Sequence, residues 1–337
     1  MLNTLQAGRA LAALAVLLFH TTTSIQHATG IAPFWEVTQF GTRGVDFFFV
    51  LSGFIIMRAH RAHIDHPELW MNFIRKRFIR IFPIYWFYTA LVVGALVAGL
   101  GKFPLPESGA GWFATISLLR VTDTLTPLPQ AWSLFHEILF YIGFSLLIIR
   151  RQLGVIVLVC WFLVSAATLE YLPAERDPAI VFFNSYNLNF ALGIGTYYAV
   201  SYIKSWEFVV AVLGLVFIIL ATIVQGLSSD LLFGIGFSFL IAAGASIEEK
   251  GAINIPMAGL LGNASYSIYL IHEVVIVVAV RVTGTLGIAN PTLLFILISL
   301  GALMAGVIAY QVFERPLLNL LRVQRAPNGA NIPKYNN

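Results

Sequence analysis

Charged residues and cysteines are scarce in this sequence. Aspartate, glutamate, lysine and arginine make up 11% of the 337 residues, whereas 58% of the residues are hydrophobic. A chain with so few charges and a mean hydropathy of +0.84 cannot bury its apolar surface in one water-soluble core. The single cysteine, Cys160, excludes intrachain disulfides and cysteine-based zinc clusters. The composition therefore predicts a membrane protein that crosses the bilayer several times.

Several functional motifs are also absent. No G-x-S-x-G sequence provides a serine nucleophile of the hydrolase type. The histidines of "HRAHIDH" (60–66) are spaced i, i+3, i+6 and lack the i, i+4 pair of zinc proteases, so we expect a solvated loop and no metal site. No nucleic-acid-reading motif accompanies the net charge of +4, and we expect no nucleic-acid partner. The first apolar segment has no clear cleavage site and is expected to remain as a span.

Apolar segments long enough to cross a bilayer recur along the whole chain. They predict an all-α polytopic membrane protein with about ten transmembrane helices in the lipid bilayer. The approximate spans are 8–26, 44–58, 80–100, 131–149, 153–170, 180–200, 206–225, 230–247, 263–283 and 291–314. We expect one membrane domain over 1–316, and a short cytoplasmic tail over 317–337 that is disordered.

The distribution of basic residues predicts the orientation. An even number of spans places both termini on one side of the membrane. With the N-terminus in the cytoplasm, fifteen of the 20 lysine and arginine residues face the cytoplasm and the other five face outward. Because cytoplasmic loops of membrane proteins are enriched in lysine and arginine, we expect both the N-terminus and the C-terminus to be cytoplasmic.

The first span carries two polar residues, in "AGRALAALAVLLFHTTT" (7–23). Arg9 and His20 are eleven positions apart, which places them on one helix face about 16 Å apart. His20 and Glu137, in "QAWSLFHEILFY" (130–141), each lie about six residues from the outer end of their spans. These matched depths allow a pair in which Glu137 orients His20 as a general base. A structural hydrogen bond between helices is the alternative explanation for a buried histidine.

The densest basic cluster is "FIRKRFIRIFPIYW" (73–86), directly before the third span. Arg77 and Arg80 are three positions apart and share a helix face. Such a cluster is typical of a topology anchor at the membrane surface. Together with Arg75, the two arginines also suit the phosphates of a ligand that arrives from the cytoplasm. Both roles are compatible.

Two further polar residues are weaker candidates for contact with a substrate. His272, in "SYSIYLIHE" (265–273), suits either the wall of a cavity or a contact between helices. Asn187 suits either sugar hydroxyls or a hydrogen bond between helices. The pair Ser52–Gly53, in "GVDFFFVLSGF" (44–54), favours a small-residue packing site over a nucleophile.

Taken in order, six motifs resemble the membrane-bound acyltransferase 3 family. They are the Arg9–His20 spacing, "GVDFFFVLSGFII", "RKRFIRIFPIYW", "WSLFHEILFY", "SYSIYLIH" and "FERP" (313–316). The resemblance covers residues 5–316 and is greatest to the bacterial exopolysaccharide O-acyltransferases. It implies transfer of an acyl group, usually acetyl from acetyl-CoA, to a hydroxyl of a cell-surface polysaccharide or its lipid-linked precursor. It also implies a multi-pass protein of the bacterial inner membrane, which works beside polysaccharide synthesis machinery.

The resemblance also implies roles for individual residues. It makes His20 catalytic, assigns Arg9, Arg77 and Arg80 to the family's conserved arginines, and makes Glu137 the acidic residue of the fourth-span motif. Family members often carry an additional soluble domain, and because this chain stops soon after residue 316 we expect direct transfer by the membrane domain.

Geometry suggests how these residues act together on acyl-CoA, which we expect as a donor substrate with no permanently bound cofactor. Arg75, Arg77 and Arg80 hold the phosphates, and Arg9 guides the donor inward. His20 takes the proton of the acceptor hydroxyl, and an acyl-histidine intermediate is an alternative route.

Two other classes of function fit the same residues. A secondary transporter, or a translocator of an envelope sugar intermediate, could use Arg9, His20, Glu137 and His272 as a proton relay. Such transporters are commonly built from internal repeats, and the sequence shows none. A non-catalytic scaffold for polysaccharide synthesis would need the buried charges only for packing. Consumption of acyl-CoA separates an enzyme from both alternatives.

Overall fold

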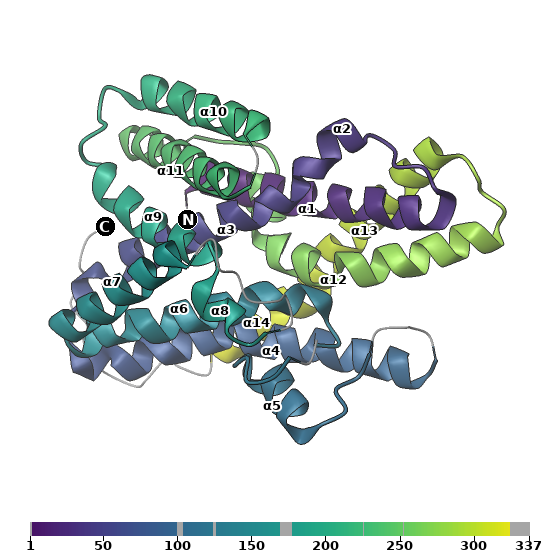
Figure 1. Cartoon of the computed structure of the whole chain (residues 1–337), viewed down its shortest axis with the longest axis horizontal. Coiled ribbons are helices and arrows are strands. Elements are labelled where there is room, and N and C mark those ends of the chain that lie inside the picture. The colour runs from purple at the N-terminus through teal and green to yellow at the C-terminus, as the bar shows by residue number, and fades with distance from the viewer. Residues whose placement is uncertain are drawn as a thin grey trace.

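The architecture comes from a computed structural model, and every regular element that it describes is a helix (Figure 1). Helices suit a chain in lipid, because each backbone N–H and C=O must find a partner within the segment itself. The prediction of an all-α fold is therefore confirmed. The described residues are 2–99, 104–123, 126–168, 177–224, 226–251 and 253–323.

Seven helical segments of the described chain are long and apolar enough to cross a bilayer. They contain α1 (Asn3–Thr29), α3 (Gly44–His60), α4 (Trp70–Val97), α6 (Trp132–Ile149), α11 (Leu227–Lys250), α12 (Ala258–Thr285) and α13 (Pro291–Ala309). Two shorter apolar helices, α7 (Arg151–Ala167) and α10 (Glu207–Ile223), coincide with two further predicted spans. Other short helices are α2 (Trp35–Thr38), α5 (Gly109–Ser117) and α14 (Arg315–Val323). By length and composition, the described residues provide seven candidate spans, compared with the ten expected.

The predicted span 180–200 is divided into α8 (Ile180–Phe183) and α9 (Tyr186–Ala199). The division has a local cause at Asn184, whose backbone is extended and whose side-chain oxygen accepts a hydrogen bond from the Tyr186 N–H at 2.9 Å. A side chain that bonds to nearby backbone in this way competes with helical hydrogen bonds. The polar residue therefore ends one helix and starts the next.

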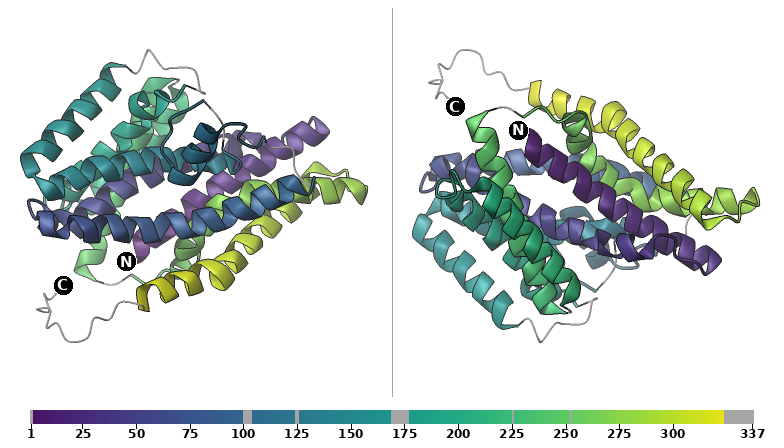
Figure 2. Two further views of the ribbon diagram at one scale, coloured as in Figure 1. Left: turned by 90° about the horizontal axis from the view of Figure 1, so that it is seen from below. Right: turned by 90° about the horizontal axis from the view of Figure 1, so that it is seen from above.

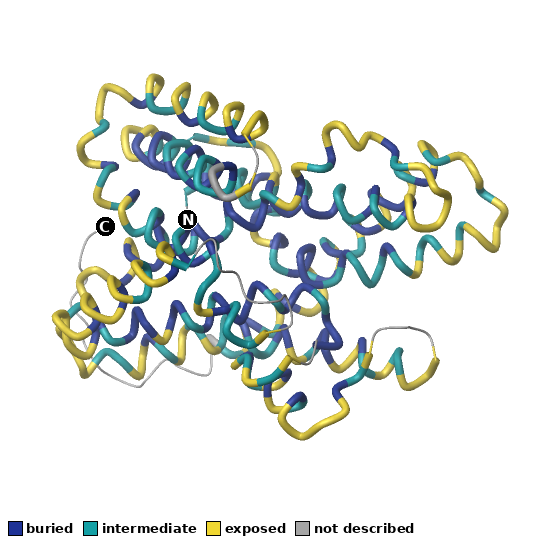
Figure 3. The backbone as a smooth tube through the Cα atoms, in the orientation of Figure 1, coloured by how far each residue is buried: buried dark blue, intermediate teal, exposed yellow. Residues whose placement is uncertain are grey.

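The helices pack in three groups around α1 and α3 (Figure 1). Helices α12 and α13 lie on one side, α4, α6 and α7 on a second, and α9, α10 and α11 on the third. Figure 3 shows an exposed outer surface along α10, which packs against α11. Exposed apolar side chains along α10, such as Phe208 and Ile219, suit contact with lipid.

Helices α3 and α9 are held together by two glycines. A Cβ atom added to Gly193 would lie 2.0 Å from the Val50 carbonyl oxygen, and one added to Gly53 would lie 2.3 Å from that of Phe190. The backbones can approach this closely only because both residues lack a side chain. The prediction of small-residue packing at Ser52–Gly53 is confirmed for Gly53.

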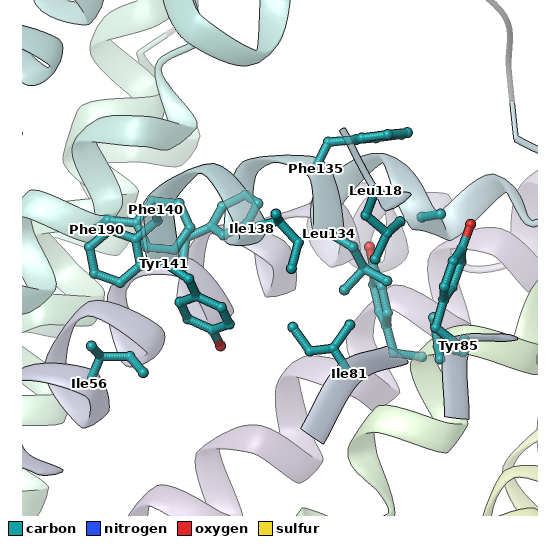
Figure 4. Packing of buried hydrophobic residues seen from close by; sticks show 14 of the residues in the cluster. Ile56, Ile81, Tyr85, Leu118, Leu134, Phe135, Ile138, Phe140, Tyr141 and Phe190 are labelled. Atoms are coloured by element: carbon teal, nitrogen blue, oxygen red, sulfur yellow. The ribbon is translucent and has the colours of Figure 1, made fainter. Parts of the chain in front are cut away.

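Aromatic side chains fill the core where α3, α4, α6 and α9 meet (Figure 4). Phe140 of α6 stacks on Phe190 of α9 with 4.4 Å between ring centroids. Beside them Tyr141 directs its hydroxyl toward the space between Ile56 and Ile81 (Figure 4). This apolar packing fixes the position of α6 and, with it, the polar side chains on its other face.

The start of α1 and the end of α14 lie at the same end of the molecule (Figure 2). The same end carries helix termini tied to one another, for example by the Thr4 N–H, which donates to Glu248 at 2.9 Å. Many exposed basic residues lie on its helix ends and loops, among them Arg58, Arg61, Arg75, Lys76, Arg150 and Arg151. We refer to it as the basic end. Helix α14 covers 315–323, so the expected tail 317–337 begins within a helix, and residues 324–337 lie outside the described residues.

Candidate active site

A cavity opens between α1, α3, α4, α6 and α12. It contains about 900 Å³ of empty space, counted to its open mouth. Four charged residues line it: Arg9, Arg77, Arg80 and Glu137. Three cations and one carboxylate give the lining a net positive charge. We call this site the arginine cavity.

The arginines reach the cavity because each lies about two turns inside its helix. Arg9 is six residues from the start of α1, and Arg77 is seven from the start of α4, so both lie roughly 10 Å from the basic end. The Arg9 guanidinium is 3.5 Å from the Gln6 side-chain oxygen, and Gln6 in turn donates to Asn263 of α12 at 2.7 Å. These contacts direct Arg9 toward α12 and away from lipid.

The positive charge of Arg80 is neutralised by the carboxylate of Glu314. The guanidinium donates to the carboxylate at 2.8 Å, and the Glu314 side chain has no exposed surface. The other carboxylate oxygen accepts a hydrogen bond from Ser267 at 2.7 Å, and Ser267 is also 2.8 Å from the Tyr88 hydroxyl. The guanidinium lies over the Tyr266 ring as well. Arg80 is therefore fixed in position by α12 and by the end of the α13 segment.

Glu314 belongs to a π-helical turn, Tyr310–Glu314, between α13 and α14. Pro316 explains the turn, because in a regular helix its ring would clash with the carbonyl of the residue four positions earlier. The wider turn removes the clash and frees carbonyl groups from strict α-helical spacing. It also leaves Glu314 fully buried beside α4.

Arg77 is held by aromatic rings and a histidine. Its guanidinium carbon is 5.7 Å from the Tyr141 ring centroid and 6.0 Å from that of Phe73. One terminal nitrogen is 3.5 Å from His60 Nε2, and His60 Nδ1 is 3.0 Å from His63 Nδ1. Because arginine only donates, His60 Nε2 is the acceptor in this contact. The "HRAHIDH" segment, expected to be a solvated loop, thus begins with a buried histidine that contacts the cavity wall.

Glu137 belongs to the arginine cavity. Its carboxylate accepts hydrogen bonds from Ser52 at 3.3 Å and from the Tyr141 hydroxyl. The expected pairing of Glu137 with His20 is not present in this structure. The reason is the depth at which α6 begins: Gln130, just before α6, already bonds to Glu273, the neighbour of His272. Glu137 is seven residues further along and lies about 10 Å nearer the basic end.

The ring neighbour of His20 is His272. Their ring centroids are 5.1 Å apart, and His272 is completely buried. His272 also lies near Tyr269, with 6.0 Å between their ring centroids, and Tyr269 lines the arginine cavity. One turn of α12 therefore separates the cavity from the histidine pair. His20 is on the same face of α1 as Arg9, about 16 Å further from the basic end.

The structure places the sequence candidates in four separate surroundings. Arg9, Arg77, Arg80 and Glu137 meet in the arginine cavity, and His20 meets His272 beyond it. Arg75 is exposed and does not line the cavity. Asn187 is fully buried elsewhere: its amide bonds His136 at 3.0 Å, Ser165 at 3.2 Å and the Val181 carbonyl at 3.0 Å. These contacts use the Asn187 side chain to hold helices together and leave little capacity for a substrate.

Sequence reasoning missed Glu314, Ser52 and the tyrosines of the cavity. Glu314 was visible as the acidic residue of "FERP", but no pattern indicated that it compensates Arg80. Ser52 was assigned to packing because Gly53 follows it, whereas only Gly53 faces α9. Tyr141, Tyr266 and Tyr269 recur at helical spacing with other core residues, so their polar contacts could not be separated from packing.

The fold and the site define a class of protein: a helical membrane protein with a cationic cavity and a deeper histidine pair on one of the same helices. Comparison with known proteins identifies the class further. The acyltransferase 3 family, described as an acyltransferase domain, matches residues 2–311, and the chain belongs to this family. It is an O-acyltransferase, which removes support from the transporter and scaffold alternatives.

Two proteins illustrate the similarity. The chain is 31% identical over 301 residues to the exopolysaccharide production protein ExoZ of Rhizobium meliloti (strain 1021). The aligned region covers 86% of this chain and 93% of that protein. It is 29% identical over 119 residues to the acyltransferase MdmB of Streptomyces mycarofaciens. That alignment covers 33% of this chain and 29% of the other protein. No solved structure matches the chain.

Proposed function

We propose that this protein transfers an acyl group, most simply acetyl, from acyl-CoA to a hydroxyl of a cell-surface polysaccharide or of its lipid-linked precursor. One observation carries the proposal: three arginines converge in one cavity, and His20 lies on the Arg9 face of α1, about 16 Å deeper. This arrangement suits a donor with an anionic head and a long, narrow reactive arm.

The donor head binds in the arginine cavity. The phosphate groups of coenzyme A accept charge-assisted hydrogen bonds from Arg77 and Arg80, whose planar guanidinium groups suit phosphate oxygens. Arg9 lies across the cavity and guides the arm along α1. Glu137, opposite these cations, limits the positive charge of the empty cavity. Exposed Arg75 attracts the donor to the mouth without contacting it in the bound state.

The thioester reaches His20 at the far end of the arm. The His20 ring takes the proton of the acceptor hydroxyl while the hydroxyl oxygen attacks the thioester carbonyl carbon. A C–O bond forms, the C–S bond breaks, and the departing thiolate takes the proton from His20. The products are the ester and free coenzyme A, so atoms and charge balance without a further reactant.

The acceptor class follows from a relative. The exopolysaccharide production protein is similar over most of its length, which supports an envelope polysaccharide as the acceptor here. The basic residues gathered at the end where α1 begins support a cytoplasmic N-terminus and C-terminus in a bacterial inner membrane. The donor then enters from the cytoplasm, where acyl-CoA is made, and synthesis machinery delivers the acceptor.

The experiment follows labelled acetyl groups. Purified protein in lipid nanodiscs is incubated with labelled acetyl-CoA and polysaccharide from the host, and both free coenzyme A and labelled glycan are measured. We expect His20→Ala to lower both products at least 10²-fold, the usual effect of losing a general base. His27→Ala changes an exposed histidine on the same helix and keeps full activity. Normal transfer by the His20 variant would refute the proposal.

A further inference from the structure

His272 has one satisfied and one unsatisfied ring nitrogen. Its Nδ1 atom is 2.7 Å from the Tyr269 carbonyl oxygen and 3.2 Å from that of Ile268. A carbonyl oxygen only accepts hydrogen bonds, so Nδ1 carries the proton and donates it. In a neutral imidazole the other nitrogen, Nε2, then holds a lone pair. The backbone of α12 therefore fixes the tautomer of His272.

The lone pair of His272 Nε2 is buried. Among the described residues it has no hydrogen-bond partner, although His272 has no exposed surface. A buried acceptor without a donor costs roughly 1–3 kcal/mol, so such an atom needs an explanation. The His20 ring lies beside the His272 ring, with 5.1 Å between the two ring centroids. A neutral His20 ring carries one N–H group, which can donate a hydrogen bond to the His272 Nε2 lone pair.

We propose that His272 is a positioning residue that accepts a hydrogen bond from the His20 ring through Nε2. This inference rests on the proposed function, in which His20 is the general base. One His20 nitrogen donates to His272, so the other nitrogen keeps its lone pair and faces the acceptor hydroxyl. When that lone pair takes the proton, His20 becomes an imidazolium whose second N–H is already held by a charge-assisted hydrogen bond. The thiolate then removes the new proton, and the pair returns to its starting state.

The charged groups nearby have other partners. Glu273 follows His272 on α12, but its carboxylate accepts a hydrogen bond from Gln130. Glu314 pairs with Arg80. Glu137 bonds to Ser52 and Tyr141.

Tyr269 also lies near His272, but its hydroxyl donates a hydrogen bond to Ser133 at 2.9 Å. Apolar side chains pack around the histidine pair as well. Helix α13 contributes Ile298 and Ala302 to the cluster that contains Ile268, and Phe19 packs edge-on against His20 at 5.1 Å. His20 itself is the titratable group that faces His272 from α1. Within the described chain, His272 is therefore the group placed to orient His20.

Two substitutions separate positioning from packing. His272→Leu fills much of the same space and removes the acceptor, whereas His272→Gln keeps an amide oxygen that can accept near the Nε2 position. His136→Gln is the matched control, since His136 is also a buried histidine but bonds to Asn187. The measurements are kcat, KM for acetyl-CoA, the pH profile of kcat/KM and the melting temperature of each variant in nanodiscs.

We expect His272→Leu to lower kcat about 10- to 100-fold with KM for acetyl-CoA unchanged, because the donor head binds at Arg77 and Arg80, away from the histidine pair. In this variant, the acid limb of the kcat/KM profile moves to lower pH, because the protonated His20 ring loses its hydrogen-bond partner. His272→Gln recovers most of the rate and of the profile, and His136→Gln keeps the profile of the unaltered protein. Equal losses in the Leu and Gln variants with an unchanged pH profile would assign His272 to packing and overturn the proposal.

A measurement on the protein without any change at His272 completes the test. In the nitrogen-15 spectrum of histidine-labelled protein, we expect His272 to have a protonated Nδ1 and an unprotonated Nε2. His20→Ala should shift the unprotonated resonance, and an unchanged resonance would also overturn the proposal. These outcomes differ from failure of the proposed function. If the proposed function fails, His20→Ala keeps full transfer. If only this inference fails, His20→Ala is inactive and His272→Leu is normal.

Discussion

Arg80 and Glu314 form an ion pair of 2.8 Å that joins the middle of α4 to the π-helical turn after α13. The Glu314 side chain is completely buried, and that of Arg80 is 30% exposed. The carboxylate thus neutralises the arginine from the side opposite the cavity, while the cavity face of the guanidinium stays open to a ligand. A structural ion pair and a proposed ligand-binding group share one residue.

The first prediction concerns the stability given by this pair. Glu314→Ala leaves a poorly solvated guanidinium without its counter-charge, and the breaking of such a pair typically costs about 3–5 kcal/mol. We expect a clearly lower melting temperature in detergent. Glu249→Ala is the control, because Glu249 pairs with Arg58 across helices but both side chains are more than one-third exposed. Such a pair is worth at most about 1 kcal/mol, so equal melting temperatures for the two variants would contradict the prediction.

The second prediction concerns donor binding. Arg77→Gln removes a cation from the cavity wall and with it a charge-assisted hydrogen bond worth about 1.5–3 kcal/mol. We expect KM and the dissociation constant for acetyl-CoA to rise roughly 10- to 100-fold. Arg75→Gln, two positions earlier on the same helix, changes an exposed residue and alters both constants less than about threefold. Titration calorimetry with acetyl-CoA measures both variants, and similar losses would place the phosphates outside the cavity.

The third prediction concerns Glu137. Glutamine keeps an oxygen that accepts from Ser52 and Tyr141 but removes the one negative charge of the cavity lining. Because the proposed donor is anionic, we expect Glu137→Gln to lower KM for acetyl-CoA a few-fold, in line with about 1 kcal/mol for one charge in a partly solvated site. Its pH profile of kcat/KM stays unchanged, since Glu137 has no contact with His20 in the structure. A large loss of kcat with a shifted profile would instead restore Glu137 as the orienting group.

The fourth prediction concerns the contact between α3 and α9. A methyl group at Gly193 would meet the Val50 carbonyl oxygen at 2.0 Å, so the helices must separate in Gly193→Ala. Overpacking costs typically 1–3 kcal/mol, and here the obstacle is backbone, which cannot rotate away. We expect a lower melting temperature and less folded protein in size-exclusion chromatography. Gly195→Ala, two residues further on α9, meets no atom within 4 Å and should match the unaltered protein.

The sequence was sufficient for the helical class and for the shared helix face of Arg77 and Arg80. Both follow from local rules: apolar length predicts a membrane helix, and spacing places Arg77 and Arg80 on one face. The break at Asn184 was harder to predict, because the residues around it are apolar enough for a continuous span. Only the hydrogen bond from the Tyr186 N–H to the Asn184 side chain shows why the helix stops there.

The position of Glu137 could not be predicted because hydropathy does not say at what depth a helix begins. The prediction assumed that α1 and α6 end at one surface. In the structure α1 continues to Thr29, whereas the chain before α6 already bonds at the level of the histidine pair through Gln130 and Glu273. A difference of a few residues in each helix displaces a side chain by about 10 Å. The partners of His20 and Glu137 were therefore decided by tertiary packing.

The single unbroken helix that carries both Arg9 and His20 has a consequence for how such chains can vary. Between these residues an insertion or deletion of one position would rotate His20 by about 100° away from the face it shares with Arg9. A change of three or four positions would restore the face but move the histidine along the axis by about one turn, roughly 5 Å. If His20 acts on the donor as proposed, chain length in this stretch can change only in whole turns, and each turn would require an acyl donor with a correspondingly longer or shorter arm.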